Sequence, residues 1–124
     1  MIIKTGVDII EVDRIQEAIE SQREAFLHKV YTQKEIDYCG NTGKMINQHY
    51  AVRFAAKEAV YKAISEVISP NEDDILNKIE ITNTEKGKPR VNLEALNIQN
   101  IESMDLSLSH IKNYAIASFS IIFK

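Results

Sequence analysis

The sequence lacks the features of a disulfide-bonded, secreted or membrane-inserted protein. One cysteine, Cys39, stands among 124 residues, which excludes an internal disulfide and a cysteine-cluster metal site and favours a reducing compartment. The start, Met1-Ile2-Ile3-Lys4, has no apolar signal region, and no apolar run approaches the roughly 18 residues that span a bilayer. We therefore expect a cytoplasmic protein that does not enter the membrane, with Cys39 buried and unreactive.

Motifs of several enzyme classes are also missing. The sequence contains neither a glycine-rich phosphate loop nor the Gly-x-Ser-x-Gly elbow of serine hydrolases. The three histidines, His28, His49 and His110, do not have the spacing of zinc ligands. A formal net charge of -3 argues against general nucleic-acid binding. Zinc enzymes, serine hydrolases and nucleic-acid binding proteins are therefore not expected.

The composition that remains is that of an ordinary globular protein. Hydrophobic residues make up 44% of the chain and charged residues 27%, and 124 residues fit one domain, which we place at 1–124. Apolar patterning and capping signals predict the elements. In the first half these are a strand at 2–10, a helix that starts at a capping box of Asp13 and Gln16, and a short helix that starts at a second box of Thr32 and Glu35. A long helix follows from about 45–50 to about Val67, and Pro70 and Asn71 end it. The second half has a strand at 79–82, a turn at 83–89 and a hairpin of 106–109 with 114–123. The predicted class is α+β, with a small antiparallel sheet and one long central helix.

The long helix carries the densest group of charged residues. Its apolar residues fall on one side at helical spacing, and Arg53, Lys57, Glu58, Tyr61 and Lys62 fall on the other. One interpretation is a solvated surface, with a Glu58–Lys62 pair worth a few tenths of a kcal/mol. The other is a carboxylate held among cations on a rigid element, which suits a phosphate site.

Asp8 is the second unusual charge, because it interrupts an apolar strand. A carboxylate there needs a cation or hydrogen-bond donors, and it either lies at a frayed strand end or turn, or binds a metal. Two separated carboxylates, Asp8 and Glu58, with several cations are what a magnesium-bound phosphate ester requires, since magnesium takes few protein oxygens.

Four ordered blocks resemble the holo-acyl-carrier-protein synthases and cover nearly the whole chain. They are Gly6-Val7-Asp8-Ile9-Ile10-Glu11-Val12-Asp13-Arg14-Ile15, then Arg53-Phe54-Ala55-Ala56-Lys57-Glu58-Ala59 with Lys62-Ala63, then Gly87-Lys88-Pro89, then Leu106-Ser107-Leu108-Ser109-His110 with Tyr114-Ala115. The first two blocks together are the most specific. The resemblance implies the phosphopantetheinyl transferase fold and transfer of 4'-phosphopantetheine from coenzyme A to a serine of an acyl carrier protein, releasing adenosine 3',5'-bisphosphate.

The resemblance also implies roles for individual residues. Asp8 and Glu58 would bind Mg²⁺, and Glu58 and Lys62 would be catalytic, with either Glu58 or a water on the metal taking the serine proton. Arg14 would contact the carrier protein. The implied coenzyme A contacts are Arg53, Lys57, Lys62, Gly87, Lys88, Pro89 and His110. A homotrimer is implied too, with active sites at subunit interfaces.

Two positions depart from the family pattern. Ile64-Ser65-Glu66-Val67-Ile68-Ser69 stands where the family has a glycine-rich turn, and Ile111 stands where a threonine usually follows the histidine. The helix region from Asp13 to Val30 also has four acids against three Lys or Arg. An alternative is therefore a non-catalytic module of the same fold that binds coenzyme A or a carrier protein, and a third is a structural oligomer with solvated charged surfaces.

Overall fold

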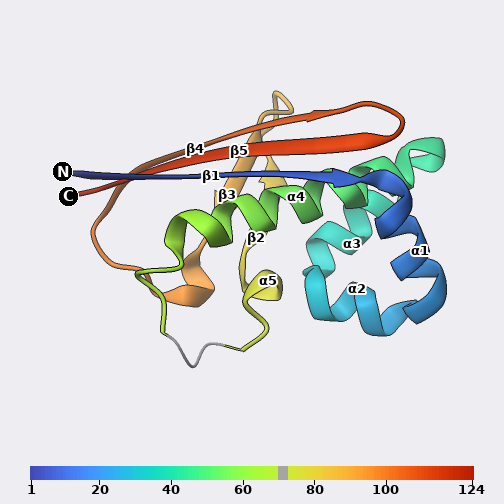
Figure 1. Ribbon diagram of the computed structural model, residues 1–124, viewed down its shortest axis with the longest axis horizontal. Coiled ribbons are helices and arrows are strands. Elements are labelled where there is room, and N and C mark those ends of the chain that lie inside the picture. Colours follow the sequence, from blue (N-terminus) through green and yellow to red (C-terminus); the bar gives the residue numbers. More distant parts are fainter. Residues whose placement is uncertain (70–72) are drawn as a thin grey trace.

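The computed structural model, which describes residues 1–69 and 73–124, is built around a long helix that lies across one face of an antiparallel sheet (Figure 1). The helix is α4 (Ile46–Ile64). The sheet has the strand order β1-β5-β4, so that β5 (Tyr114–Phe123) lies between β1 (Ile2–Glu11) and β4 (Ile101–His110). Both pairs are antiparallel, and the hairpin predicted at the C-terminal side is confirmed.

The remaining elements cover the other sides of α4. A two-stranded sheet of β2 (Glu80–Asn83) and β3 (Pro89–Asn92) follows the short helix α5 (Ile75–Lys78), and a 3-10 turn, η2 (Glu94–Leu96), leads to β4. At the end of the sheet where β1 stops lie three helices (Figure 1). These are α1 (Val12–Gln22), α2 (Glu24–Val30) and α3 (Gln33–Gly40), followed by the 3-10 turn η1 (Gly43–Met45).

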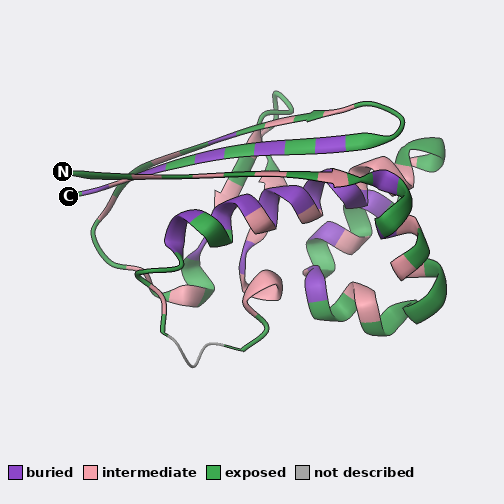
Figure 2. Ribbon diagram, in the orientation of Figure 1, coloured by how far each residue is buried: buried purple, intermediate pink, exposed green. Residues whose placement is uncertain are grey.

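Period-two alternation in β5 explains why the sheet packs on α4. Every second residue from Ala115 to Phe123 is buried, and the residues between them face away from α4, which Figure 2 shows as alternating colours along the strand. The opposite face of the sheet is open and partly apolar. Its large exposed side chains include Ile3, Val7, Ile9, Tyr114 and Ile116.

Gly6 lets β1 come close to α4. A Cβ at this position would lie 1.8 Å from the carbonyl oxygen of Ala59, which is far inside van der Waals contact. Only glycine fits such an approach of strand to helix backbone. Asp8, two residues further along the same side of β1, is therefore carried directly against α4.

Two boundaries differ from the predictions. The capping box at Thr32 and Glu35 is confirmed, but the one at Asp13 is wrong, because α1 already begins at Val12, which is buried and donates its N–H to the Asn113 carbonyl at 2.9 Å. Helix α4 ends at Ile64, three residues before the predicted end at Val67. The exposed residues after Ile64 form a turn in which the Val67 N–H donates to the Ile64 carbonyl. The predicted stop at Pro70 and Asn71 lies outside the described residues.

Candidate active site

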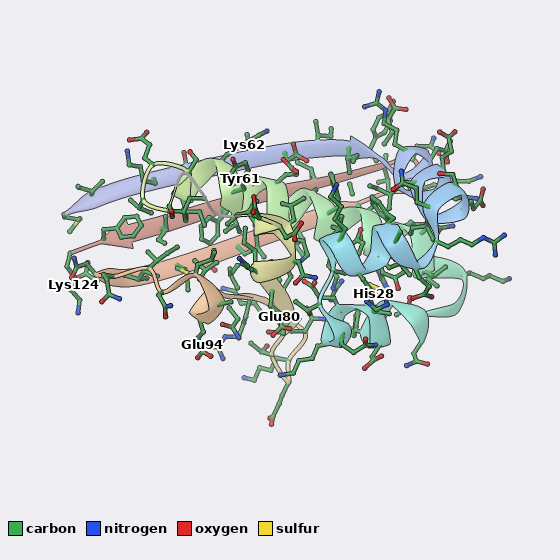
Figure 3. The ribbon with its side chains drawn as sticks, turned by 90° about the horizontal axis from the view of Figure 1, so that it is seen from below. His28, Tyr61, Lys62, Glu80, Glu94 and Lys124 are labelled. Atoms are coloured by element: carbon green, nitrogen blue, oxygen red, sulfur yellow. The ribbon has the colours of Figure 1, made fainter. Side chains whose placement is uncertain are left out.

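Asp8 and Lys62 form an ion pair between β1 and α4. The Lys62 ammonium lies 3.1 Å from Asp8 Oδ1 and also donates to the Val7 carbonyl at 3.0 Å, so Lys62 is beside β1 (Figure 3). The Asp8 side chain is only 17% exposed, and Asp8 pairs with Ala117 well inside the strand. The interpretation of Asp8 as a frayed strand end is therefore wrong, and the half-buried carboxylate has the cation that its burial requires.

Glu58 shares a pocket with Asp8. The pocket has a volume of about 340 Å³, and its lining also includes Glu11, Arg14, Phe54 and Tyr114. Burial and the negative charge of Asp8 raise the pKa of Glu58 above its ordinary value of 4.5, and Lys62 opposes the increase. Two carboxylates that share one pocket make a site that attracts a cation.

The donor set of this pocket fits a magnesium ion. Carboxylate oxygens are the protein ligands that Mg²⁺ prefers, and one or two of them suffice when phosphate and water complete its coordination. Across residues 1–69 and 73–124, no group of three or more His, Cys, Asp or Glu side chains could hold a metal unaided. An ion held by Asp8 and Glu58 would thus keep several positions for substrate oxygens.

Arg53 and Lys57 are not on a solvated surface, and that part of the predicted charged face is wrong. Arg53 is 4% exposed and Lys57 is 0% exposed, because α4 is covered on nearly all sides (Figure 2). The Arg53 guanidinium lies 4.2 Å from the centre of the Tyr38 ring, a cation–π contact.

Lys57 has protein partners for all of its donors. Its ammonium lies 2.7 Å from Glu35 Oε1, donates to the Leu76 carbonyl at 2.9 Å and also donates to the Ile79 carbonyl. Burial lowers the pKa of Lys57, and the charge of Glu35 opposes this effect. The predicted contact of Lys57 with a coenzyme A phosphate conflicts with this placement, since no N–H of the ammonium is left for a ligand.

The other predicted coenzyme A contacts lie away from Asp8 and Glu58. His110 Nδ1 is 2.8 Å from Gln48 Oε1, with the His49 ring edge-on at 5.6 Å. Lys88 forms an ion pair with Asp105 at 3.0 Å, and Lys88 and Pro89 line a different pocket of about 420 Å³ between β3 and β4. Within one chain, then, the structure brings together Asp8, Glu58, Lys62 and Arg14 but separates them from the Gly87–Pro89 turn and from His110.

Sequence reasoning missed five residues that line the pocket, the apolar Ile9 and Ile10 among them. Glu11, Phe54 and Tyr114 were not among the predicted site residues, although Glu11 and Tyr114 are directly opposite in the β1–β5 register. The pairing of β1 with β5 would have placed Tyr114 beside the site, but nothing in the local pattern of either strand specifies that pairing.

Comparison with known proteins decides the family. Residues 4–118 match the family model of the 4'-phosphopantetheinyl transferase superfamily. A holo-[acyl-carrier-protein] synthase of Ruminiclostridium cellulolyticum is 44% identical over 117 residues, covering 90% of this chain and 86% of the relative. The one of Protochlamydia amoebophila is 42% identical, covering 94% of this chain and 95% of the relative. The chain belongs to the holo-[acyl-carrier-protein] synthase family.

Solved structures of this synthase family confirm the predicted fold. The synthase of Bacillus anthracis in complex with CoA (3',5'-ADP) is 30% identical, with a TM-score of 0.76 over 95% of this chain and 94% of that one. The synthase of Helicobacter pylori in complex with coenzyme A is 28% identical, with a TM-score of 0.79 over 95% and 99% of the two chains. Among the residues that this structure describes, no helix is long and apolar enough to cross a membrane.

Proposed function

We propose that the protein transfers 4'-phosphopantetheine from coenzyme A to a serine of an apo acyl carrier protein and depends on Mg²⁺. The observation that carries the proposal is the pocket in which Asp8 and Glu58 lie together beside Lys62, in a chain that belongs to the synthase family. Solved relatives bound to coenzyme A support the choice of donor. The buried, free thiol of Cys39 fits a reducing compartment such as the cytoplasm.

The chain's own residues supply charge and position. Asp8 and Glu58 would hold the magnesium ion, which when bound neutralises charge on the coenzyme A pyrophosphate. The Lys62 ammonium is fixed at the Asp8 side of the pocket, where it would stabilise the phosphate that leaves. The serine oxygen forms a bond to the phosphorus that carries the pantetheine arm, and the bond from that phosphorus to the bridging oxygen breaks, releasing adenosine 3',5'-bisphosphate.

The serine proton needs an acceptor, and we assign it to Glu58. Its carboxylate lines the same pocket as Arg14, where the carrier protein would present the serine. Arg14 lines the open side of the same pocket and would meet the carrier protein as it presents the serine.

A homotrimer with active sites between subunits completes the proposal. The Asp8–Glu58 pocket lacks the Gly87–Pro89 turn and His110 of its own chain, so these residues would reach coenzyme A from a neighbouring copy. Arg53 would act from beside His49, since its charge lowers the pKa of His49, after the larger effect of burial. The exposed apolar side chains on the outer face of the sheet are suited to cover one another in such an assembly.

Mass spectrometry tests the proposal directly. Purified protein with coenzyme A, MgCl₂ and an apo acyl carrier protein should add one phosphopantetheine arm to the carrier. Glu58→Gln should reduce the rate at least a hundredfold, because it removes one of the two magnesium carboxylates and the proton acceptor, whereas the exposed Glu94→Gln should match the wild type.

Two other outcomes have clear meanings. No mass gain with any carrier protein would refute the transferase. Binding of coenzyme A or carrier protein without transfer, unaffected by Glu58→Gln, would favour the non-catalytic module.

A further inference from the structure

A buried ion pair links α3 to α4 beside the proposed active site. Glu35 and Lys57 both have side chains with 0% exposure, and the carboxylate and ammonium lie 2.7 Å apart. Charges removed so fully from water persist only when their remaining hydrogen-bonding groups also have partners. The partners that Glu35 and Lys57 have therefore show which elements the pair holds.

Glu35 joins three elements through its two oxygens. Oε1 receives the Lys57 ammonium and the Thr32 N–H, at 2.8 Å, while Oε2 receives the N–H of Ile81 in β2 at 2.7 Å. Lys57 extends the network to the carbonyls of Leu76 and Ile79, on either side of the end of α5. The start of β2 is thus fastened to α4 through side chains.

A second contact runs parallel to the first, one helical turn away. Tyr38 follows Glu35 by three residues on α3, and Arg53 precedes Lys57 by four on α4, so both pairs lie on the facing sides of the two helices. Helix α3 therefore contacts α4 at two places. The Glu35–Lys57 pair lies next to Glu58, and the Tyr38–Arg53 pair lies towards the His49 and His110 rings.

We propose that Glu35 is a positioning residue for coenzyme A binding. By holding the Ile81 N–H and the Lys57 ammonium with one carboxylate, Glu35 fixes the β2–β3 hairpin, which carries Gly87, Lys88 and Pro89, relative to the helix that carries Glu58 and Lys62. The inference rests on the proposed function, in which the hairpin of one copy and α4 of its neighbour form one donor site. By fixing each hairpin on its own α4, Glu35 would set where that hairpin meets the adjacent site. It predicts that a defect at Glu35 affects coenzyme A and leaves the carrier protein, which docks at Arg14, unaffected.

The test separates positioning from stability with three variants. Glu35→Gln leaves the Lys57 charge buried without its partner and should lower the melting temperature, whereas Glu35→Gln with Lys57→Met removes both charges and should restore most of it. Glu35→Asp retains the charge on a shorter side chain. For the double variant and for Glu35→Asp we expect KM for coenzyme A to rise at least tenfold and KM for the carrier protein to stay within twofold of the wild type.

Structural and binding measurements complete the experiment. Amide hydrogen exchange at Ile81 should accelerate in the double variant, and Glu94→Gln, at an exposed site, serves as the matched control. The inference would be overturned if the double variant, on regaining the wild-type melting temperature, also regained the wild-type kcat and both wild-type KM values. If the wild type transfers no arm to any carrier, the proposed function fails, and calorimetric dissociation constants for coenzyme A then decide the inference by the same tenfold criterion.

Discussion

Neighbouring residues of α4 have opposite surroundings, and one helical step explains the difference. Lys57 points towards α3 and ends in a network of buried acceptors, whereas Glu58, about 100° further round the helix, reaches the pocket beside Asp8. Burial shifts both pKa values towards the neutral form, downward for Lys57 and upward for Glu58. The lysine is compensated by Glu35, while Glu58 has a second carboxylate as its neighbour and keeps its affinity for a cation.

At Gly6, a single methyl group should separate the two halves of the carboxylate site. Gly6→Ala would place Cβ 1.8 Å from the Ala59 carbonyl oxygen, so β1 must move away from α4. We expect a loss of about 1–3 kcal/mol in the free energy of unfolding, measured with urea, because overpacking against backbone cannot be relieved by a side-chain rotation.

Gly40→Ala is the matched control for this substitution. A Cβ at Gly40 meets no atom within 4 Å, so the same change in chemistry should alter stability by less than about 0.5 kcal/mol. Equal effects of the two substitutions would show that the close approach at Gly6 does not matter for stability.

At the scale of elements, local signals predicted what local interactions determine. The capping box fixes the start of α3, and alternation fixes the hairpin of β4 and β5. The solvated face of α4 was wrong because the prediction assumed that the polar side of a helix faces water, and α4 instead has neighbours on several sides. Burial all round a helix depends on contacts with distant elements, which a helical period does not reveal.

The candidate site likewise contains residues that local signals could identify and residues that they could not. Asp8, Glu58 and Lys62 could be selected because an acid in an apolar strand and a charged group on a helix are locally unusual. Glu35 could not, because its capping role accounts for its position in the sequence. Its bonds to Lys57 and Ile81 join residues 22 and 46 positions away.

The packing of α2 and α3 against α4 predicts sensitivity to alkaline pH. Burial is the largest cause that raises the pKa of Cys39 to about 12, the pKa of Tyr50 to about 12, and the pKa of Tyr31 well above its ordinary 10.0. The folded protein therefore keeps these protons at a pH where the unfolded chain loses them. The free energy of unfolding should fall as pH rises above about 9, by up to about 1.4 kcal/mol per pH unit for each group.

Urea unfolding between pH 8 and pH 11 checks this dependence. In Cys39→Ala the free energy of unfolding should fall less steeply as pH rises, by the contribution of about one proton. The variant should nevertheless be less stable than the wild type at pH 8, because the buried sulfur is removed. An identical slope in the variant and the wild type would show that the native state does not retain the Cys39 proton.

For the whole molecule, the open face of the sheet predicts the oligomeric state. Ile116, on the central strand of this sheet, is 41% exposed and lies directly opposite Ile9 on β1, which is 63% exposed. In the proposed trimer, Ile116→Lys would bury three lysines without partners, so light scattering should show the mass of one chain in place of three.

Val67→Lys provides the comparison, since Val67 is 46% exposed in the turn after α4, away from this face. It should leave the mass unchanged. Loss of transfer activity should accompany dissociation in Ile116→Lys, because each proposed site draws on two copies. A wild-type protein with the mass of a single chain would contradict the trimer.

The strand order has a further consequence for how the chain folds during synthesis. Among the strands that the structure describes, β1 pairs with β5 alone, and the ends of these two strands lie side by side (Figure 1). The first strand to leave the ribosome therefore has no partner until residues 114–123 have also emerged. Until then the buried side of α4 has no sheet to pack against, so the sheet closes only after translation has passed β5, and the nascent chain depends on its helices to shield apolar surface from aggregation.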